Sequence, residues 1–247
     1  MSDEKRKQHC FFLLVRCNAY VSLLTIFILL TFTGRANAMV QDSIKKIHWL
    51  GHDGFRIDAS QVIYIDPFQL KTTIPADLIL ITHDHYDHCS PEDIKKIQKK
   101  DTVFITEAAS AKKLQGDIRI VKPGDTTTVG GITIEAVASY NTNKEFHPKS
   151  SGLLGFILTV DNVRIYHAGD TDFIPEMKNF KADIALLPVS GTYVMTAGEA
   201  AEAALAINPA VAIPMHFGSI VGSEDDARTF SEKLSGKLTV NILKREP

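Results

Sequence analysis

The segment between residues 78 and 91 constrains the fold of this chain more than any other part of the sequence. Four apolar residues at 78–81 are followed by Thr-His-Asp-His-Tyr-Asp-His-Cys at 82–89. Ser90 and Pro91 then mark a helix start, because serine caps free backbone N–H groups and proline fits the first helical turn. A buried strand that leads through a polar loop into a helix is typical of a mixed α/β architecture.

The polar loop carries three imidazoles and two carboxylates within six residues. These nitrogen and oxygen donors suit zinc, manganese or iron. His83 and His85 are two residues apart in an extended segment, so they point to one side and can share an ion. Asp87 and His88 lie where the chain turns into the helix and therefore face a neighbouring position. The spacing favours two adjacent ions, and the alternative is a solvated polar loop or a single structural metal.

Further strands and helices surround this loop in the sequence. Runs rich in branched residues predict strands at 44–50, 55–59, 62–65, 102–105, 118–121, 132–138, 153–160, 163–167, 184–187 and 211–213. Apolar periodicity predicts helices at 107–114, 197–207 and 224–234, besides the one that begins at Ser90. No linker or low-complexity tract divides residues 39–247, so we expect one domain with a single core.

One internal similarity suggests two related halves. Residues 76–81 read Ala-Asp-Leu-Ile-Leu-Ile, and residues 182–187 read Ala-Asp-Ile-Ala-Leu-Leu. We expect each to be a buried strand that delivers a functional loop at its C-terminal end. The two halves would then each consist of a sheet with helices outside it.

Three later motifs extend the pattern of the polar loop. They are Tyr-His-Ala-Gly-Asp-Thr at 166–171, Leu-Pro-Val-Ser-Gly-Thr-Tyr at 187–193 and Ile-Pro-Met-His-Phe at 213–217. With His-x-His-x-Asp-His behind a buried strand, this order resembles the metallo-β-lactamase superfamily over residues 44–244. The resemblance implies an α/β fold, a four-layer αββα sandwich. Trp-Leu-Gly-His at 49–52 and Ile-Asp-Pro at 65–67 are similar to the branch that includes ascorbate-6-phosphate lactonase-like and N-acylphosphatidylethanolamine phospholipase D-like proteins.

The resemblance also implies a set of ligands for two divalent ions. One ion would be held by two histidines of the loop and a third histidine, the other by a loop aspartate and two histidines, with one carboxylate bridging both. The expected metal ligands are His83, His85, Asp87, His88, His147, Asp170 and His216. His147 is the third histidine of the first ion, and the alternative is that Asn141 or water completes that site.

Three residues are expected to take part in catalysis. Asp87 and Asp170 would offset the metal charge and orient or relay a proton. The resemblance places His52 near the pocket without coordination, where it would contact the metal ligands or the substrate; the alternative is a hydrogen-bonded loop histidine. Asp66 either orients a metal-bound histidine or makes a turn. His167 is expected to be a hydrogen-bonded core residue.

Several loop residues could contact a substrate. Tyr140, Asn141, Lys149, Thr192 and Tyr193 lie in loops expected near the metals. Lys149 is a point charge suited to phosphate or carboxylate. The alternative for each is a solvated loop residue, and Tyr193 is the strongest candidate because it follows the strand at 184–187.

Residues 1–38 have the layout of a secretory signal peptide. A basic start at residues 5–7 precedes an apolar run at 20–32, and Ala36-Asn37-Ala38 ends the segment with small residues. The run is shorter than the roughly 20 residues that cross a bilayer. We therefore expect a periplasmic or secreted hydrolase domain at 39–247; the alternatives are an uncleaved membrane anchor or a start at Met39, which would make it cytoplasmic.

The charge and cysteine content of residues 39–247 narrow the class of partner. Without its leader the chain would change from a net charge of −2 to −5 and keep one cysteine, Cys89. An acidic balance without a basic block argues against nucleic acid as partner. A single thiol cannot form an internal disulfide, and we expect Cys89 to be a small buried residue. The expected partner is a small-molecule substrate, with no stable membrane partner after leader cleavage.

These residues predict a metal-dependent hydrolase. Divalent ions lower the pKa of bound water from about 15.7 toward about 7, so a dimetal-bound hydroxide would attack an ester, lactone or phosphoester bond of a small polar substrate. Zn²⁺ suits the donors first and Mn²⁺ second. The alternatives are a phospholipase D-like phosphodiesterase and a non-catalytic periplasmic metal-binding protein. Redox relatives carry glutamate in place of the second histidine of the motif, whereas this chain has His85.

Overall fold

The computed structural model describes residues 37–71 and 73–246. The predicted leader at 1–38 lies almost entirely outside the described residues, and residues 37–45 are helical. The chain divides into two compact units, Met1–Asp42 and Ser43–Pro247. None of the helices in the described ranges is both long enough and apolar enough to cross a membrane.

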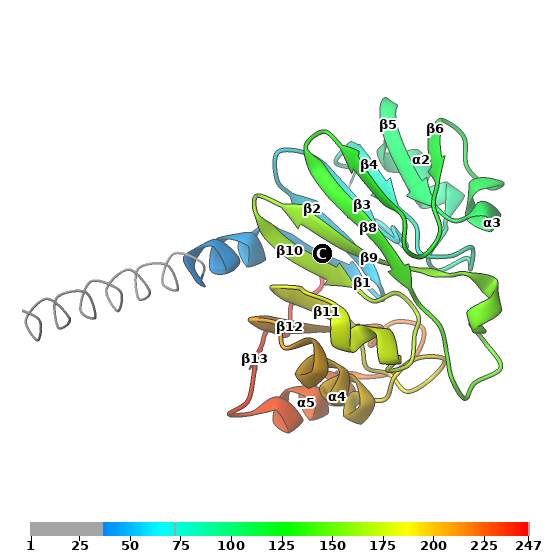
Figure 1. The fold of residues 1–247 in the computed structure, drawn as a ribbon. Coiled ribbons are helices and arrows are strands. Elements are labelled where there is room, and N and C mark those ends of the chain that lie inside the picture. The colour runs from blue at the N-terminus through cyan, green and yellow to red at the C-terminus, as the bar shows by residue number, and fades with distance from the viewer. Residues whose placement is uncertain (1–36, 72, 247) are drawn as a thin grey trace, which may run out of the picture. The chain divides into compact units, whose positions relative to one another are not determined.

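The unit Ser43–Pro247 is built on two β-sheets (Figure 1). The first sheet contains, in spatial order, β1 (Ile47–Gly51), β2 (Gly54–Asp58), β3 (Val62–Ile65), β4 (Ala76–Leu80), β5 (Gln98–Thr106) and β6 (Asp117–Ile120). The second contains β13 (Thr239–Val240), β12 (Val211–Met215), β11 (Ile184–Pro188), β10 (Val163–His167), β9 (Leu154–Val160), β8 (Ile132–Ala138) and β7 (Thr126–Val129). The inner faces meet in the core, where the rings of Phe55 on β2 and His167 on β10 lie 5.7 Å apart, edge to face.

The two sheets share one plan, as the internal similarity predicts. In the first, β1–β3 pair antiparallel and β3–β6 pair parallel. In the second, β7–β10 pair antiparallel and β10–β13 parallel. The carboxylate of Asp77 on β4 accepts from the backbone N–H of Val62 at 2.7 Å, and that of Asp183 before β11 accepts from Arg164 at 2.8 Å. β4 and β11 thus occupy equivalent positions, and each leads into a polar loop at its C-terminal end.

Helices cover the outer faces of both sheets, which completes four layers. α2 (Pro91–Ile97) begins at Ser90, whose hydroxyl accepts from the N–H of Asp93, and its Ile94 and Ile97 are buried against the first sheet. The helices over the second sheet are α4 (Ala197–Ile207) and α5 (Glu224–Leu234), which pack on β11 and β12. The short elements are α3 (Ala108–Ala111), η1 (Lys149–Ser151) and η2 (Pro175–Asn179). The predicted αββα sandwich is confirmed.

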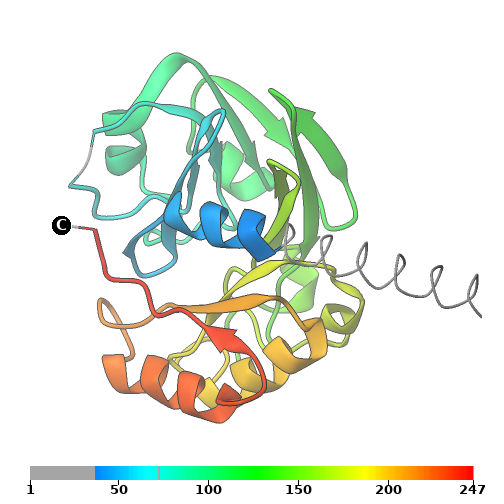
Figure 2. The same ribbon diagram turned by 90° about the vertical axis from the view of Figure 1, so that its left-hand side faces the viewer.

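The C-terminal segment returns to the first sheet (Figure 2, red). Arg245 forms a parallel bridge with Trp49 of β1, and its guanidinium donates to the carbonyl of Leu50 at 2.9 Å. The carboxylate of Glu246 accepts from buried Arg56 at 2.8 Å. These contacts tie the C-terminal segment to β1 and β2, the two strands that flank the turn with His52.

Some predicted boundaries are wrong for local reasons. The strand predicted at 44–50 starts at Ile47, because residues up to Lys45 are helical. The helix predicted at 107–114 is only one turn long, with Glu107 as its cap. β7 is rich in threonine and β13 has two residues, so neither showed an apolar strand pattern.

Candidate metal centre

The candidate ligands gather at one end of the two sheets. The loop after β4 carries His83, His85, Asp87 and His88, and the remaining candidates come from four other connections. These are the β1–β2 turn with His52, the loop after β8 with His147, the loop after β10 with Asp170 and the loop after β12 with His216. Residues more than a hundred positions apart therefore meet at one place because their strands end at the same edge.

Three histidines form a first cluster. The Nε2 atom of His83 lies 3.0 Å from Nδ1 of His85, and Nε2 of His147 lies 3.2 Å from the same Nδ1. One ligand atom from each lies within 4.8 Å of the others. Two nitrogens on one tetrahedral zinc ion are about 3.4 Å apart, given Zn–N bonds of about 2.0–2.1 Å. The three nitrogens are therefore spaced as the ligands of one ion would be, and His147 is the third of them.

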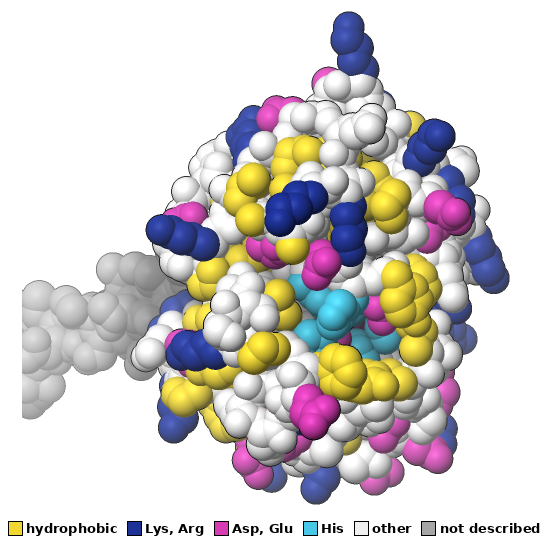
Figure 3. All heavy atoms as spheres, turned by 90° about the vertical axis from the view of Figure 1, so that its right-hand side faces the viewer, with side chains coloured by type: hydrophobic (Ala, Val, Ile, Leu, Met, Phe, Trp, Pro, Cys, Tyr) yellow, Lys and Arg dark blue, Asp and Glu magenta, His cyan; other side chains and the backbone are white. Residues whose placement is uncertain are grey.

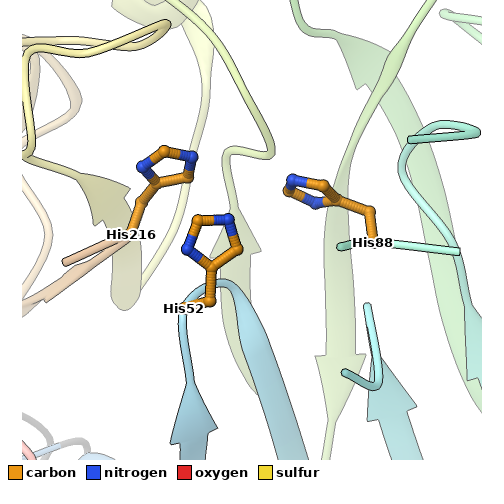
Figure 4. Close-up of side chains that lie close together, drawn as sticks. All are labelled: His52, His88 and His216. Carbon is orange, nitrogen blue, oxygen red and sulfur yellow. The ribbon is translucent and has the colours of Figure 1, made fainter. Parts of the chain in front are cut away.

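A second cluster lies beside the first and is shown in Figure 4. It consists of His88, His216 and His52, with one ring nitrogen of each within 4.8 Å of the others. The rings of His52 and His216 are 4.1 Å apart. Asp87 lies at the edge of this cluster: its Oδ2 is 4.0 Å from Nε2 of His88 and accepts from Nε2 of His52 at 3.1 Å. The structure therefore makes His52 a member of this cluster, whereas the sequence placed it only near the pocket. Asp87 is its hydrogen-bond partner.

Asp170 lies between the two clusters. Its Oδ1 is 3.5 Å from Nε2 of His88 and 3.4 Å from Nε2 of His216, while its Oδ2 is 3.5 Å from Nε2 of His147. One carboxylate oxygen thus faces each cluster, so Asp170 lies within reach of both. Gly169 before it has φ +63°, and a Cβ there would lie 2.7 Å from the carbonyl oxygen of Leu154, so only glycine fits.

Buried polar atoms without partners test whether these residues fit a cation. Among the described residues, Nε2 of His88 and Oδ1 of Asp170 are buried and make no hydrogen bond. Such atoms cost about 1–3 kcal/mol each when left unpaired. Both face the same position between His88, His216 and Asp170, where a divalent ion would satisfy them. The donor set therefore fits a metal.

Hydrogen bonds behind the clusters fix which nitrogen of each ring is free. Asp66, which is fully buried, accepts from Nδ1 of His88 at 2.8 Å, and from the N–H and hydroxyl of Thr82 at 2.8 and 2.6 Å. The Thr82 hydroxyl, having donated to Asp66, accepts from Nδ1 of His83 at 3.0 Å. The hydroxyl of Ser190 donates to the carbonyl of Thr192 at 3.3 Å and therefore accepts from Nδ1 of His216 at 2.9 Å. Each of these rings therefore carries its proton on Nδ1 and turns a free Nε2 to the clusters.

Burial and neighbouring charges set the protonation states of the cluster histidines and of Asp170. Burial, followed by the positive charge of His88, lowers the pKa of His83 well below its ordinary value, so its lone pair is available. Burial also lowers the pKa of His147. Burial alone would raise the pKa of Asp170, but His216 and His88 outweigh it and the pKa falls well below its usual range. Burial alone would lower the pKa of His88, but Asp170 and Asp66 outweigh it and raise that pKa well above its usual range. Metal binding requires a deprotonated carboxylate and neutral imidazoles, so an ion bound at His88 would release its proton.

Backbone strain concentrates at this site. Nine described residues other than glycine have positive φ, and five of them belong to the clusters or contact them: His52, Asp66, His147, Tyr193 and His216. Such conformations cost about 1–3 kcal/mol each and persist where surrounding contacts hold them. Around His147 the side-chain amide of Asn141 donates to the carbonyls of Phe146 and Tyr193, at 2.9 and 2.6 Å. Asn141 thus supports the loop that presents His147.

Asp53 was not among the candidates. The sequence suggested only a turn at Asp53-Gly54, yet the side chain is fully buried and groups with His88, Asp170 and His216. Neither of its carboxylate oxygens has a hydrogen-bond partner among the described residues. Burial and then Asp170 raise its pKa well above the usual range. No sequence signal marked it, because turn propensity does not tell on which side of the backbone a side chain points.

Other candidates have structural roles. Nζ of Lys149 donates to Glu176 at 2.8 Å and does not line the metal cavity. His167 donates from Nε2 to the carbonyl of Asp53 at 2.9 Å and accepts from the N–H of Gly169 at 3.2 Å, so it is a hydrogen-bonded core residue as predicted. Cys89 is buried, and burial raises the pKa of its thiol to about 11.

Comparison with known proteins agrees with this geometry. The β-lactamase superfamily domain matches residues 46–216. The UPF0173 metal-dependent hydrolase of Thermoplasma acidophilum is 35% identical over 190 residues, or 70% of this chain and 84% of the relative. The corresponding protein of Pyrococcus abyssi is 32% identical over 216 residues, or 81% and 96%. A solved structure from Parabacteroides distasonis, assigned as a metal-dependent hydrolase, is 37% identical with a TM-score of 0.73 and covers 81% of this chain and 93% of its own. The chain therefore belongs to the metallo-β-lactamase superfamily, in the family of UPF0173 metal-dependent hydrolases.

Proposed function

We propose that the chain hydrolyses an ester, lactone or phosphoester bond of a small substrate with the help of two divalent ions, Zn²⁺ by preference or Mn²⁺. One ion would be held by His83, His85 and His147, the other by Asp87, His88 and His216, with Asp170 between them. The observation that carries the proposal is the placement of Asp170, whose two oxygens lie 3.4–3.5 Å from histidine nitrogens of different clusters. Two such ions would supply nucleophilic water at neutral pH and polarise the bond under attack.

The protein side of the reaction is proton handling and orientation. Asp87 and His52 are joined at 3.1 Å, and both line a cavity of about 440 Å³ that opens over the clusters. Asp87 would accept a proton from the attacking water, with His52 holding its carboxylate in place. No serine or cysteine nucleophile is needed, which agrees with the buried thiol of Cys89.

Removal and return of metal test this proposal on the full chain. We expect chelation to remove about two ions per chain and to abolish turnover on a panel of generic esters, lactones and phosphodiesters, and Zn²⁺ or Mn²⁺ to restore it. At free metal 1000-fold above Kd, binding stabilises the fold by about 4 kcal/mol, so chelation is also expected to lower Tm by roughly 10 °C. Chelation that leaves turnover intact, with the metal shown to be gone, would refute the mechanism.

The competing proposal is a metal-binding protein without catalysis. Full metal occupancy with no turnover on any member of the panel would favour it. The retained carboxylates and the open cavity over them favour the enzyme, since a purely structural site is usually closed by protein ligands. A closer placement in the ascorbate-6-phosphate lactonase-like and phospholipase D-like branch rests on the motifs at 49–52 and 65–67 alone.

The role of His147 is tested separately. In His147→Ala we expect the first ion to bind more weakly by more than the roughly 10–100-fold that loss of a supporting partner costs, because water replaces an imidazole there, with the second ion retained. Metal content at limiting free zinc reads this out. His48→Ala is the matched control, since His48 is a strand histidine whose partner is Asp58. Unchanged metal content in His147→Ala would remove His147 from the ligand set.

Export, a small-molecule substrate and the absence of a nucleic-acid or stable membrane partner complete the proposal. The leader at 1–38 supports export through its basic start, apolar run and Ala-Asn-Ala end. N-terminal sequencing of the chain recovered from its native compartment would test it, with cleavage after Ala38 expected.

A further inference from the structure

The walls of the metal cavity are apolar. Its floor consists of cluster residues, whereas its walls are formed by Tyr86, Phe146, Tyr193, Ile220 and Val221. Figure 3 shows the histidines at the bottom of a hollow with hydrophobic side chains on either side. Of the seven large hydrophobic side chains exposed in the described ranges, four line this one cavity. Exposed apolar groups gathered at one place mark a binding surface rather than chance exposure.

The walls are also held in shape before any substrate arrives. The rings of Phe146 and Tyr193 meet edge to face, with centroids 4.9 Å apart. Tyr86, which also lines the cavity, meets Phe68 in the same way at 5.8 Å. Edge-to-face pairs are a favourable aromatic geometry. Preformed apolar walls bind a matching group without the cost of ordering side chains on binding.

Positive side chains near the cavity already have partners. Lys113 pairs with Asp84 at 3.0 Å, Lys149 pairs with Glu176 at 2.8 Å, and Lys144 pairs with Asp172. No lysine or arginine of the described residues lines the cavity. The metals would neutralise charge that develops at the reacting atom, but the walls offer nothing to a second charge on the substrate, such as a phosphate or carboxylate.

From these walls we infer that the substrate carries an uncharged apolar acyl or alkyl group, which lies against Tyr86, Phe146 and Tyr193. The inference rests on the proposed function. It narrows the substrate class to molecules whose group beside the reacting bond is uncharged, because a charge on that group would lie against apolar walls that have no cation. A cavity of about 440 Å³ is of the size that holds a small organic molecule.

A matched series of p-nitrophenyl substrates tests the inference on the full chain loaded with Zn²⁺. We expect kcat/KM to rise about tenfold from the acetate to the butyrate, since two more methylene groups are buried. The hemisuccinate, which has the same chain length but a terminal carboxylate, is expected to react at least tenfold more slowly than the butyrate.

Variants tie the preference to the walls. Ile220→Ala is expected to lower kcat/KM for the butyrate severalfold more than for the acetate. Ile120→Ala is the control, because Ile120 is also an exposed isoleucine but lies on β6 outside the cavity, and it should change neither value. Preference for the hemisuccinate over the butyrate would overturn the inference and leave the hydrolase intact. No turnover of any substrate by fully metal-loaded protein would overturn both.

Discussion

Asp170→Asn is expected to lower turnover by about 1000-fold and to reduce metal content from two ions to one or none. The carboxylate faces histidine nitrogens of both clusters, at 3.4–3.5 Å, and its charge offsets that of both cations. Asparagine keeps the shape but removes the charge, and it turns an N–H donor toward one cluster. Loss of one preorganised electrostatic contact in an active site costs about 10²–10³ in rate, and here metal affinity falls as well. Turnover and metal analysis on the same sample measure the two effects.

Asp77→Asn is the matched control for this substitution. Asp77 is a carboxylate at the start of β4, about 16 Å along the strand from the metal-binding loop. It accepts from the N–H of Val62 and pairs with Lys99, so its loss affects the sheet and leaves the clusters alone. We expect normal metal content and turnover in Asp77→Asn. Two bound ions and near-normal rates in Asp170→Asn would contradict the bridging role.

The fold could be predicted largely because its signals are local. In the segments 62–65, 132–138 and 163–167, apolar residues alternate with polar ones or follow one another along the whole strand. The strands β3, β8 and β10 have the same bounds. α4 has Thr196 as its N-terminal cap, and the side chains of Thr196 and Glu199 each accept from the other's backbone N–H. Asn208, with φ 55°, is the C-terminal cap. The edge strands β7 and β13 were missed because an edge strand needs no apolar pattern.

The metal-binding residues could be predicted where several of them lie close together in the sequence, but not where a residue stands alone. Three histidines and two aspartates in six residues indicate a metal without any structure. Asp53 could not be found that way, because only the strained turn at His52, with φ 52°, sends its neighbour's side chain into the core. The apolar walls were missed for another reason. Phe146 and Tyr193 are 47 positions apart, and their contact depends on two loops that Asn141 joins.

Asp66→Asn is the second substitution with a large expected effect. One oxygen of Asp66, Oδ2, accepts both from Nδ1 of His88 and from the Thr82 hydroxyl, and the other accepts from the N–H of Thr82. If the amide nitrogen of asparagine takes the place of the first oxygen, His88 and the Thr82 hydroxyl must both become acceptors. His88 then carries its proton on Nε2, and the hydroxyl turns to donate to Nδ1 of His83, so both rings lose the free nitrogen that faces the clusters. If it takes the place of the other oxygen, it meets the Thr82 N–H as donor against donor.

The first orientation makes Asp66→Asn a defect of both clusters, although Asp66 contacts no ion position, and the second places two donors against each other at Thr82. Loss of such a supporting partner typically weakens metal binding about 10–100-fold, and a wrong histidine tautomer costs up to about 10⁴ in rate in a serine protease triad. We expect both ions to bind 10–100-fold more weakly in competition with a chelator, and turnover at limiting metal to fall by about 1000-fold. Thr82→Val separates the effect on His83 from the effect on His88. It removes only the hydroxyl that accepts from His83, and should therefore weaken the first ion while sparing the second. Equal weakening of both ions in Thr82→Val, or of neither in Asp66→Asn, would show that the tautomers are not set through this carboxylate.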